Sequence, residues 1–576
     1  MSIFNAPGQN YFVPGTDFLA EHAPCSPQAR TCRGLAHRDP AKRDLYLDDV
    51  YEGITRLLGA IDRNPFRPTY GCLDRQFWHY RTACFPSEMY QEGVLPLALV
   101  YSCKLPDNRW HGSQRVRELA IAGMRFSARS CHLDGSCDDY YPFERALGAA
   151  VFSLQAAAKA YQLLELNDAE LLAWFKRRAR WLIDNEESGR LTNHHALAAL
   201  GLWRVAEITG DSQFREAAAE RVEQVLTWQD KEGWFDEYDG ADPGYQTVTI
   251  DCLAKLRQAS GDDRFDEPIR RAVNFARHFL HPDGSYGGEY GSRGTCHFYP
   301  HGFELCAERS PQAADLADGF LEAVELGTHA HFDDDRLFAH RLANRIEAYL
   351  DWTPTRALAH QDPQTSVASF PKAGLVVARN TQRHTVVSTA RGGVTKHFQD
   401  DGCMTDAGLV VETRDGTVSV SQMHDRGRTV DVQTDPDGTA KITIAGSLHA
   451  ARSETATPLK QSLLHTGMWV LGRWCRTAVR KLLQRRLITG RKPFPIHFKR
   501  TVELRNGTPS VRITDEIQLM SPAIHVQRLA IGTDHQSAYV AACNVYQDSI
   551  LEPWTDLAEH VEKLNRHRKV VIVREF

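Results

Sequence analysis

Two different spacings of hydrophobic residues divide the chain. From about residue 45 to residue 350, segments such as AELLAWFKRRARWLI and NHHALAALGLWRVAEI carry apolar residues at positions i, i+3 and i+4, which predicts helices. Short turns that contain Gly and Asp separate these segments, a pattern typical of antiparallel helix pairs. Beyond about residue 365, runs such as HTVVST, KITIAG and SVRITDEI are short, β-branched and bounded by turn residues, which predicts a sheet or sandwich.

These spacings also predict the domain organisation. We expect an N-terminal extension over residues 1–44, a helical domain over 45–350, a linker over 351–368 and a strand-rich domain over 369–576. The linker is rich in proline and polar residues, which interrupt both spacings. A chain of 576 residues agrees with more than one domain, because single cores stop growing at about 250–300 residues.

The helical domain contains an internal repeat. The segments HLDGSCDDYY (132–141), DKEGWFDEYDG (230–240) and HPDGSYGGEYG (281–291) share a Gly followed by an acidic residue and Tyr, and EESGRLTNHH (186–195) is a fainter copy. Their first glycines are about 50 residues apart, which is the length of one helix hairpin with its loops. Equivalent loops of successive hairpins fall on one face. If the hairpins close into a ring, acidic, Tyr, Asn and His side chains converge at its mouth.

Composition and charge change this picture little. The 42% hydrophobic and 24% charged residues are ordinary for a folded protein, and the formal net charge of −5 singles out no partner. The first residues lack a basic segment followed by an apolar stretch, and no apolar run reaches about 18 residues, so we expect neither a secretory signal nor a membrane span. Thirteen cysteines without CxxC spacing favour reduced thiols, so we expect a cytoplasmic protein.

The residue types in the repeated loops suit one kind of carbohydrate chemistry. Cleavage of a 4-linked uronic-acid polysaccharide by elimination requires removal of the proton on carbon 5. That proton is weakly acidic until hydrogen-bond donors or cations neutralise the neighbouring carboxylate. A base then takes the proton, and an acid protonates the leaving oxygen on carbon 4. Tyr, His, Asn and Arg side chains supply these functions without a metal or a covalent nucleophile.

Three residues carry a resemblance to a known family. Asn193 and His194 open a predicted helix, and Tyr245 follows about 50 residues later in GADPGYQTVTIDCLA. This arrangement resembles the heparinase II/III-like polysaccharide lyases and the related alginate lyases and uronate epimerases, and the resemblance covers most of the chain. It implies an α+β multidomain fold, an incomplete N-terminal (α/α) toroid of helix hairpins followed by a C-terminal antiparallel β-sandwich.

The resemblance also implies roles for these residues. Asn193 would neutralise the substrate carboxylate, His194 would assist as neutraliser or base, and Tyr245 would be the general acid and a second candidate for the base. A histidine of the strand-rich domain would reach the same site, and RGGVTKHFQDDG offers His397, with His384 as the weaker candidate. Relatives often show H-x-H-x-D with a bound metal at this point. Only two aspartates, at 400 and 401, follow His397 here, so we expect no metal and no cofactor.

Each assignment has a structural alternative. Asn193 is also a favoured N-cap residue, and Tyr245 also suits a buried aromatic residue with a satisfied hydroxyl. Adjacent histidines on a helix point in different directions, so we expect His195 to be structural.

The stretch GGEYGSRGTCHFYPHGFE (287–304) concentrates polar groups among glycines that permit close backbone approach. We expect Arg293 to bind a substrate carboxylate through its planar guanidinium, with a surface ion pair as the alternative. The four-residue spacing of His297 and His301 also fits two zinc ligands, but no third ligand is evident. The further substrate-binding candidates are Asp139, Tyr140, Trp234, Tyr238, Glu289, Tyr290, His297 and His301.

A basic helical insertion is expected in the strand-rich domain at about 460–490. Between Thr455 and Arg500 there are eleven Lys or Arg residues and no Asp or Glu, and apolar residues from Leu464 to Leu482 follow one helical face. Such a helix suits contact with an anionic membrane surface or a polyanion, or packing on the sandwich with a solvated basic face. A peripheral location at the inner membrane is therefore compatible with the sequence.

The sequence thus predicts a lyase that acts on an acidic polysaccharide. A uronate carbon-5 epimerase of polysaccharide biosynthesis shares the first proton abstraction and is the nearest alternative. A toroid glycoside hydrolase needs two carboxylates, for which Asp139, Glu237, Asp251 and Glu289 are candidates. A non-catalytic polysaccharide-binding protein would use the aromatic residues alone. We expect no nucleic-acid partner, because no recognised motif is present, and the sequence specifies no oligomeric state.

Overall fold

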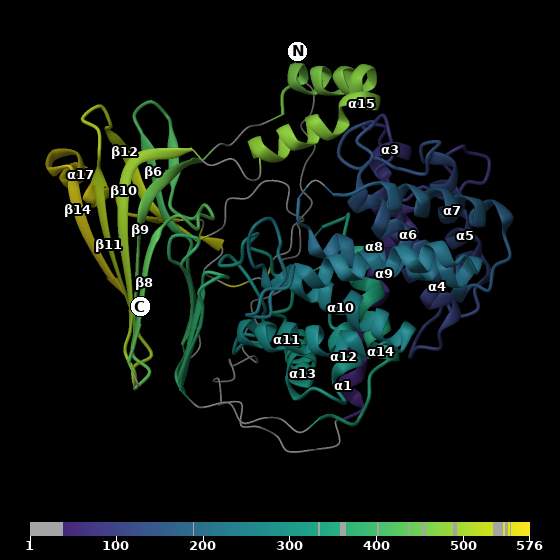
Figure 1. Ribbon diagram of the computed structural model, residues 1–576, viewed down its shortest axis with the longest axis horizontal. Helices are drawn as coiled ribbons and strands as arrows, with labels where there is room; N and C mark the ends of the chain where they lie inside the picture. The colour runs from purple at the N-terminus through teal and green to yellow at the C-terminus, as the bar shows by residue number, and fades with distance from the viewer. Residues whose placement is uncertain are drawn as a thin grey trace, which may run out of the picture.

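The structure is a computed structural model. It describes residues 39–187, 189–331, 334–357, 365–399, 402–435, 437–451, 456–487, 492–533, 545, 547, 551–552 and 554–576. Helices form the first part of the chain and two β-sheets the second (Figure 1), as the hydrophobic spacings predict. None of the helices in these ranges is long and apolar enough to span a membrane.

Within the described residues, six helices line the inside of a ring, and each contacts the next. These inner helices are α4 (Val94–Ser102), α6 (Leu147–Leu163), α8 (Thr192–Thr209), α10 (Pro243–Ser260), α12 (His301–Cys306) and α14 (Phe338–Leu350). The outer helices are α2 (Val50–Ala60), α5 (Gln114–Ser130), α7 (Ala169–Asp184), α9 (Ser212–Thr227), α11 (Asp266–Ala276) and α13 (Pro311–Leu326). Contact between α14 and α4 closes the ring, so the toroid is complete rather than incomplete.

Because an outer helix precedes each inner helix, the inner helices run parallel and all begin at one end of the ring, its mouth. Short helices complete this part of the chain: α1 (Ala41–Asp44), α3 (Arg75–Trp78) and the 3-10 turns η1 (Leu45–Leu47), η2 (Glu88–Gly93), η3 (Asp263–Phe265) and η4 (Arg277–Phe279).

Local chemistry sets the ends of the toroid helices. Asp168, Asp211 and Asp242 begin α7, α9 and α10, and each side chain accepts a hydrogen bond from a backbone N–H of the first turn. Gly210 and Gly261 end α8 and α10 in the left-handed conformation, with φ of 69° and 72°.

The repeated glycines hold the loops of the mouth against the outer helices. Gly135, Gly189, Gly233 and Gly284 all have positive φ, between 79° and 118°. A Cβ atom on the first, third or fourth would lie 2.3–2.8 Å from backbone atoms of α7, α11 or α13. Only glycine fits such an approach, which explains why the repeat appears in the sequence.

The second part of the chain forms a sandwich of two antiparallel sheets. The first sheet has the order β1-β2-β3-β4-β5. Its strands are β1 (Ser366–Phe370), β2 (Leu375–Arg379), β3 (Arg383–Ser388), β4 (Val394–Gln399) and β5 (Gly402–Asp406).

The second sheet has the order β13-β12-β6-β7-β9-β10-β11-β14, and β8 also pairs with β9. Its strands are β6 (Gly408–Thr413), β7 (Val418–Val420), β8 (Thr429–Thr434), β9 (Ala440–Ala451), β10 (Pro493–Leu504), β11 (Val511–Leu519), β12 (Val526–Gly532), β13 (Trp554–Asp556) and β14 (Lys569–Glu575). The turn η5 (Ala558–His560) and helix α17 (Val561–His567) lie between β13 and β14.

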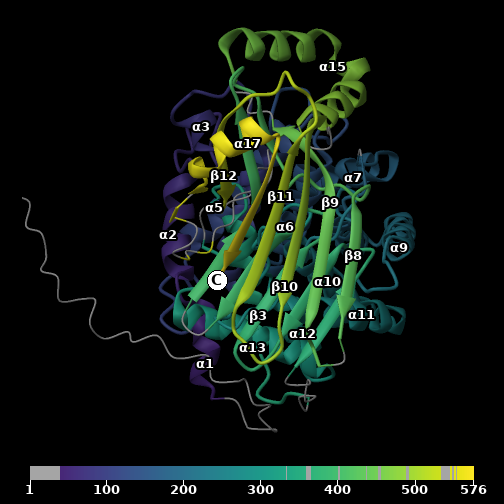
Figure 2. The same cartoon turned by 90° about the vertical axis from the view of Figure 1, so that its left-hand side faces the viewer.

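The first sheet is buried on both faces. Val377 and Val386 belong to the hydrophobic core of the toroid, whereas their neighbours Val376 and Val387 belong to the core between the two sheets. Successive side chains of a strand point to opposite faces, so this sheet lies between the toroid and the second sheet. Figures 1 and 2 show the same order of layers.

Helix α15 (Pro458–Leu487) is inserted between β9 and β10. Its packed face meets the toroid: a Cβ on Gly472 would lie 3.2 Å from Cβ of Phe143, and His465 Nδ1 lies 3.8 Å from Cys84 Sγ. The expected insertion is therefore present, but it packs against the toroid rather than on the sandwich. A cavity of about 580 Å³ lies beneath it, lined on the toroid side by loop residues such as Phe85, His132 and Phe143.

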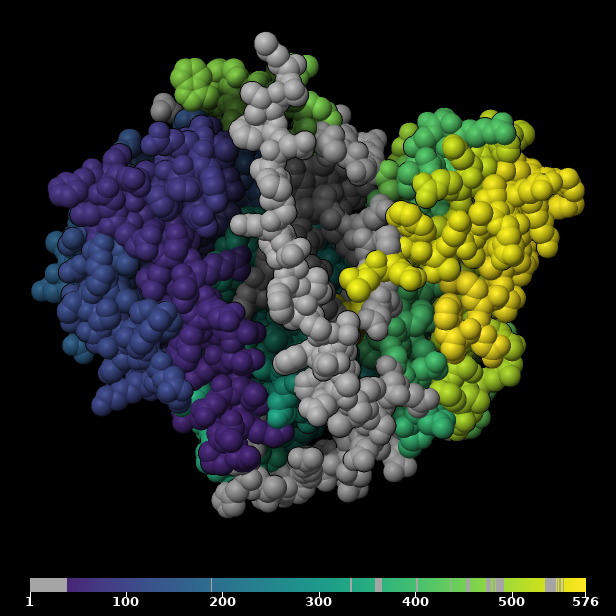
Figure 3. Space-filling view, turned by 180° about the vertical axis from the view of Figure 1, so that it is seen from behind, coloured from purple at the N-terminus to yellow at the C-terminus, as the bar shows by residue number. Residues whose placement is uncertain are grey.

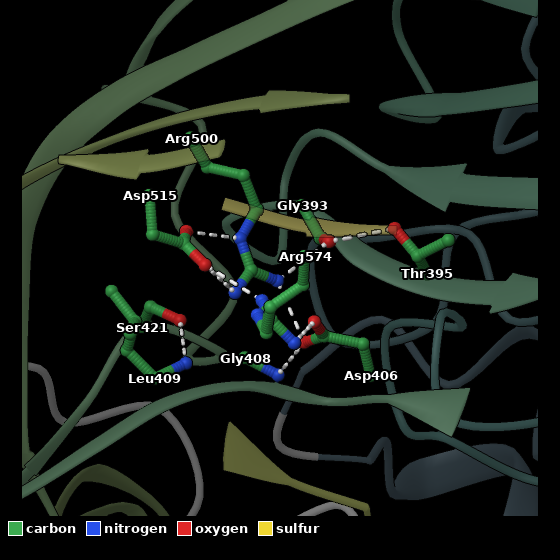
Figure 4. A network of polar contacts seen from close by, with 9 residues as sticks. All are labelled: Gly393, Thr395, Asp406, Gly408, Leu409, Ser421, Arg500, Asp515 and Arg574. Carbon is green, nitrogen blue, oxygen red and sulfur yellow. Dashed lines mark hydrogen bonds and ion pairs between the residues drawn. The ribbon is translucent and has the colours of Figure 1, made fainter. Parts of the chain in front are cut away.

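A buried ion network joins the two sheets (Figure 4). Arg500 of β10 forms two hydrogen bonds of 2.7 and 2.9 Å with Asp515 of β11 and one of 2.7 Å with Asp406 at the end of β5. Arg574 of β14 bonds both aspartates, at 2.8 and 2.7 Å. Arg500 also donates to the carbonyl of Gly393, at 3.1 Å, and so holds the β3–β4 loop.

Candidate active site

Asn193 and His194 lie in the first turn of α8 at the mouth of the toroid. The N-cap of α8 is Leu191, and no side chain caps the helix, so Asn193 does not act as an N-cap. Its backbone N–H donates to Glu237 Oε1 at 2.9 Å, and its buried side-chain amide interacts with the same carboxyl group but forms no well-formed hydrogen bond with the described residues. A buried amide whose hydrogen-bonding capacity is not satisfied is suited to a ligand oxygen.

The orientation of His194 is set by a buried carboxylate. His194 Nδ1 lies 3.2 Å from Glu187 Oε2, and the Glu187 side chain is fully buried. Because a carboxylate only accepts, Nδ1 carries the hydrogen, and Nε2 of the neutral ring keeps a lone pair. Gly148 of α6 makes room for the ring, since a Cβ there would lie 2.8 Å from His194 Cε1. The Glu187 contact and Gly148 thus fix the orientation of the His194 ring.

His195 faces the other way, as the sequence predicts. Arg221 of α9 donates to its Nδ1 at 2.9 Å. Burial, with the Arg221 charge beside it, lowers the pKa of His195 to about 4, so the ring is neutral and structural.

Tyr245 lies in the first turn of α10, the inner helix next to α8. The Asp242 cap accepts from its backbone N–H at 3.1 Å, and its ring lies 5.3 Å from that of His297. Burial raises the pKa of the Tyr245 phenol well above its ordinary value, although the Arg293 charge opposes the shift. The hydroxyl therefore stays protonated and suits a proton donor rather than a base.

Arg293 is buried rather than part of a surface ion pair. Its guanidinium stacks on the ring of Tyr238 at 4.9 Å, and its side chain has no acidic partner within the described ranges. Its backbone N–H donates to Asp242 Oδ2 at 2.9 Å, so the residue that caps the Tyr245 helix also fixes the Arg293 loop. Asp242 thus holds the backbone at both Tyr245 and Arg293.

Arg391 of the sandwich completes this part of the site, and the sequence reasoning missed it. Its Nη1 donates to the carbonyls of Gly291 and Ser292, at 2.8 and 3.2 Å, immediately before Arg293. Burial and the neighbouring Arg293 charge lower the pKa of Arg391 to about 9. The only signal in the sequence is an Arg that precedes two glycines in a loop, and this becomes informative only when the two domains are docked.

Aromatic contacts link His194 to Tyr245 around the inside of the ring. Phe152 packs against both His194 and His340, with ring centroids 5.7 and 5.2 Å apart. Tyr299 continues the series from His340 to His297, at 5.1 and 6.1 Å, and His297 contacts Tyr245. Residues from α6, α8, α10 and α14 therefore surround one region at the mouth.

His297 is a neutral donor in this region. Arg341 donates to its Nδ1 at 3.1 Å, so the hydrogen lies on Nε2, which is buried without a partner among the described residues. Burial and the Arg341 charge hold the pKa of His297 well below its ordinary value. His301 begins α12, and its Nε2 forms a 2.7 Å hydrogen bond with Asp351 Oδ2. No group of three or more potential metal ligands occurs in the described part of the chain.

Other predicted substrate-binding residues have protein partners. Glu289 forms a 3.0 Å ion pair with Lys396 of β4, and Asp139 pairs with Arg336. Tyr140 is 45% exposed and stacks on Arg336 at 4.2 Å, so it remains available at the rim of the mouth.

Two aromatic predictions need correction. Tyr290 is 1% exposed and its hydroxyl bonds His281 Nε2 at 2.9 Å, so it belongs to the toroid core. Trp234 is 5% exposed, with its indole N–H bonded to Glu232 at 3.1 Å, and offers no open face for a sugar ring.

The prediction for His397 is wrong. Its neighbours on β4, Lys396 and Phe398, face the toroid, where they contact Glu289 and His281. Strand alternation therefore turns His397 toward the second sheet, where its Nδ1 bonds the Thr385 hydroxyl at 2.8 Å. Burial lowers the pKa of His397 to about 4. The weaker candidate, His384, does face the toroid, with its ring 5.6 Å from that of His281. Positions 400 and 401 lie outside the described residues.

Comparison with solved structures identifies the fold. The chondroitin AC lyase of Streptomyces coelicolor matches with a TM-score of 0.50 and 12% identity, over 88% of this chain and 71% of that one. The chain has the fold of a toroid-plus-sandwich polysaccharide lyase. A Paenibacillus xanthan lyase matches with a TM-score of 0.48 and 11% identity over 86% of this chain. The chain spans about half of that protein, since 47% of it is covered.

A further solved structure matches part of the chain. An unsaturated glucuronyl hydrolase of Streptococcus agalactiae matches over 57% of this chain and 95% of its own, with a TM-score of 0.38 and 11% identity. No family model and no curated protein matches the sequence. Because the sequence identities are only 11–12%, these similarities show the fold alone, and a fold does not determine the reaction.

Proposed function

We propose that the chain is a polysaccharide lyase that cleaves a uronic-acid-containing polysaccharide by β-elimination. The observation that carries the proposal is the placement of a histidine base and a protonated tyrosine in the first turns of two adjacent helices. His194 is held through Nδ1 by Glu187, and Tyr245 has a raised pKa. The names of the chondroitin AC and xanthan lyases that share the fold support an acidic polysaccharide as the substrate class.

Neutralisation of the substrate carboxylate is the first requirement. The Asn193 amide, which has no well-formed hydrogen bond to the described residues, and the Arg293 guanidinium, which stacks on Tyr238, are suited to this task. Six inner helices also begin at the mouth, so their positive dipole ends favour an anion there. Together these groups make the carbon-5 proton more acidic, because they stabilise the charge that develops on the carboxylate.

The elimination then needs two proton transfers. His194 Nε2 takes the carbon-5 proton, the electron pair of that C–H bond forms the double bond between carbons 4 and 5, and the bond from carbon 4 to the leaving oxygen breaks. Tyr245 donates its hydroxyl proton to that oxygen. After the products leave, His194 gives its proton to water, and Tyr245 takes a proton from water.

A retaining or inverting hydrolase is less well supported by the carboxyl groups. Asp139 and Glu289 are paired with Arg336 and Lys396, and Asp251 is paired with Lys255 at 2.7 Å. Of the four carboxyl candidates, only Glu237 lies beside Asn193 without an ion pair in the described residues. Glycoside hydrolysis requires two such groups about 5–9.5 Å apart.

The first experiment is to incubate the protein with a panel of uronic-acid polysaccharides and to follow the ultraviolet absorbance of the unsaturated product. We expect a rise with at least one polymer and a loss of about 100-fold or more in Tyr245→Phe. Tyr286→Phe is the matched control, because it removes a buried hydroxyl that has no partner among the described residues.

A flat absorbance trace with every polymer would contradict the lyase proposal. The same incubations in heavy water then separate the alternatives. Deuterium at carbon 5 without cleavage would indicate an epimerase, which returns a proton to the opposite face. Cleavage without a double bond would indicate a hydrolase.

A further inference from the structure

Helix α15 exposes an apolar surface that the proposed function does not use. Six of its large apolar side chains are between 50% and 72% exposed: Leu459, Leu463, Trp469, Val470, Leu471 and Leu482. Large apolar groups gathered on one exposed element mark an interaction surface, whereas scattered ones do not.

The opposite side of α15 is already engaged. Met468 is 1% exposed, and Gly472 lies against Phe143 of the toroid. The exposed side therefore cannot turn inward without breaking this packing. Figures 1, 2 and 3 all show α15 at the same extreme end of the molecule, above the toroid.

The charge of the helix restricts what it binds. Between positions 458 and 487 there are seven Lys or Arg residues and no Asp or Glu. A second copy of the chain would bring two such helices together and is disfavoured by their repulsion. A polyanionic sugar would match the charge but would leave the exposed leucines, valine and Trp469 against hydroxyl groups.

We propose that α15 binds the surface of an anionic lipid bilayer. The leucines, Val470 and Trp469 enter the boundary between headgroups and acyl chains, and the positive charge of the segment favours the anionic lipid phosphates. Helix α15 has 30 residues and is bent into two arms, and we expect it to lie along the interface rather than to cross the bilayer.

The sandwich does not need this helix for its own closure. β9 and β10 pair at His449 and Pro493, and Ala450 N–H bonds the carbonyl of Lys492 at 2.9 Å. The chain thus leaves and re-enters the sheet at one point, so α15 is an addition to an otherwise continuous hairpin. This proposal does not depend on the chemistry of the active site.

The test is co-sedimentation of the full chain with vesicles of phosphatidylcholine alone or mixed with phosphatidylglycerol. We expect binding to the mixed vesicles only, weakened by high salt because screening acts on exposed charges. The triple variant Leu459→Ser, Leu463→Ser, Trp469→Ser should lose about tenfold or more of this binding.

The matched control is Val571→Ser with Val573→Ser, which removes exposed valines, 47% and 59% exposed, from β14. It should bind vesicles like the unaltered chain. Absence of binding to mixed vesicles, equal binding to neutral vesicles, or full binding by the triple variant would each overturn the proposal. So would a lipid-free dimer, seen by sedimentation velocity, that only the triple variant abolishes.

Discussion

Replacement of Arg500 by methionine tests the buried network that joins the two sheets. Arg500 is fully buried and contributes four hydrogen bonds, two to Asp515, one to Asp406 and one to the Gly393 carbonyl. Methionine fills a similar volume but leaves both carboxylates with Arg574 as their only described cation. The variant therefore removes one partner from a buried set of charges.

The expected cost is about 3–5 kcal/mol, because an uncompensated buried charge remains after one partner is removed. Arg512→Met on neighbouring β11 is the control. Its ion pair with Glu575, at 3.0 Å, joins side chains that are 37% and 54% exposed, so the loss should be at most about 1 kcal/mol.

A chain of two domains need not unfold in one step, so the stability of β10, β11 and β14 should be measured locally by hydrogen exchange. Arg500→Met should lower protection in these strands by roughly two to three and a half orders of magnitude. If protection in Arg500→Met equals that in Arg512→Met, the network does not stabilise the sandwich and the reasoning is refuted.

The same variant has a defined pH dependence. Burial alone would raise the pKa of Asp406, but Arg500 and Arg574 outweigh it and lower that pKa. A carboxyl whose pKa is lower in the folded state contributes stability above its unfolded value of about 4, and this is lost as the pH falls through the folded pKa. The difference between Arg500→Met and the unaltered chain should therefore shrink below about pH 4.

Three further predictions concern the candidate active site. Arg293→Lys should raise KM about tenfold or more with a smaller change in kcat, because lysine cannot form a planar two-point contact with a carboxylate; an unchanged KM would exclude substrate binding by Arg293. Glu187→Gln should lower kcat about 10- to 100-fold, because the carboxylate that fixes the Nδ1 side of the His194 ring is lost; an unchanged kcat would count against His194 as the base. Gly148→Ala should abolish most activity by displacing the His194 ring, whereas Gly59→Ala, where a Cβ meets nothing within 4 Å, should leave activity intact.

Local sequence patterns determined the element types and part of the site. The i, i+3, i+4 spacing and the β-branched runs separate helices from strands, because each reflects burial of one face of a regular backbone. The repeated glycines predicted that their loops lie together at one end of the ring. In the structure these glycines have positive φ, and three of them lie close to the backbone of an outer helix. Asn193, His194 and Tyr245 came from the resemblance to a lyase family, and the structure places them in the first turns of α8 and α10.

Tertiary structure alone decided which side chains reach the mouth. His397 and its neighbour Lys396 are equally polar in sequence, but a shift of one residue along a strand reverses the face, and only the docked toroid fixes which face meets it. Arg391 lies about 100 residues from the carbonyls it binds, and its role exists only at the contact between domains. The toroid residues that contact α15, such as Cys84 and Phe143, are likewise distant from it in the chain. The spacing of apolar residues predicts that one face of a helix or strand is buried. It does not predict which other segment packs on that face, because that depends on contacts between residues far apart in the chain.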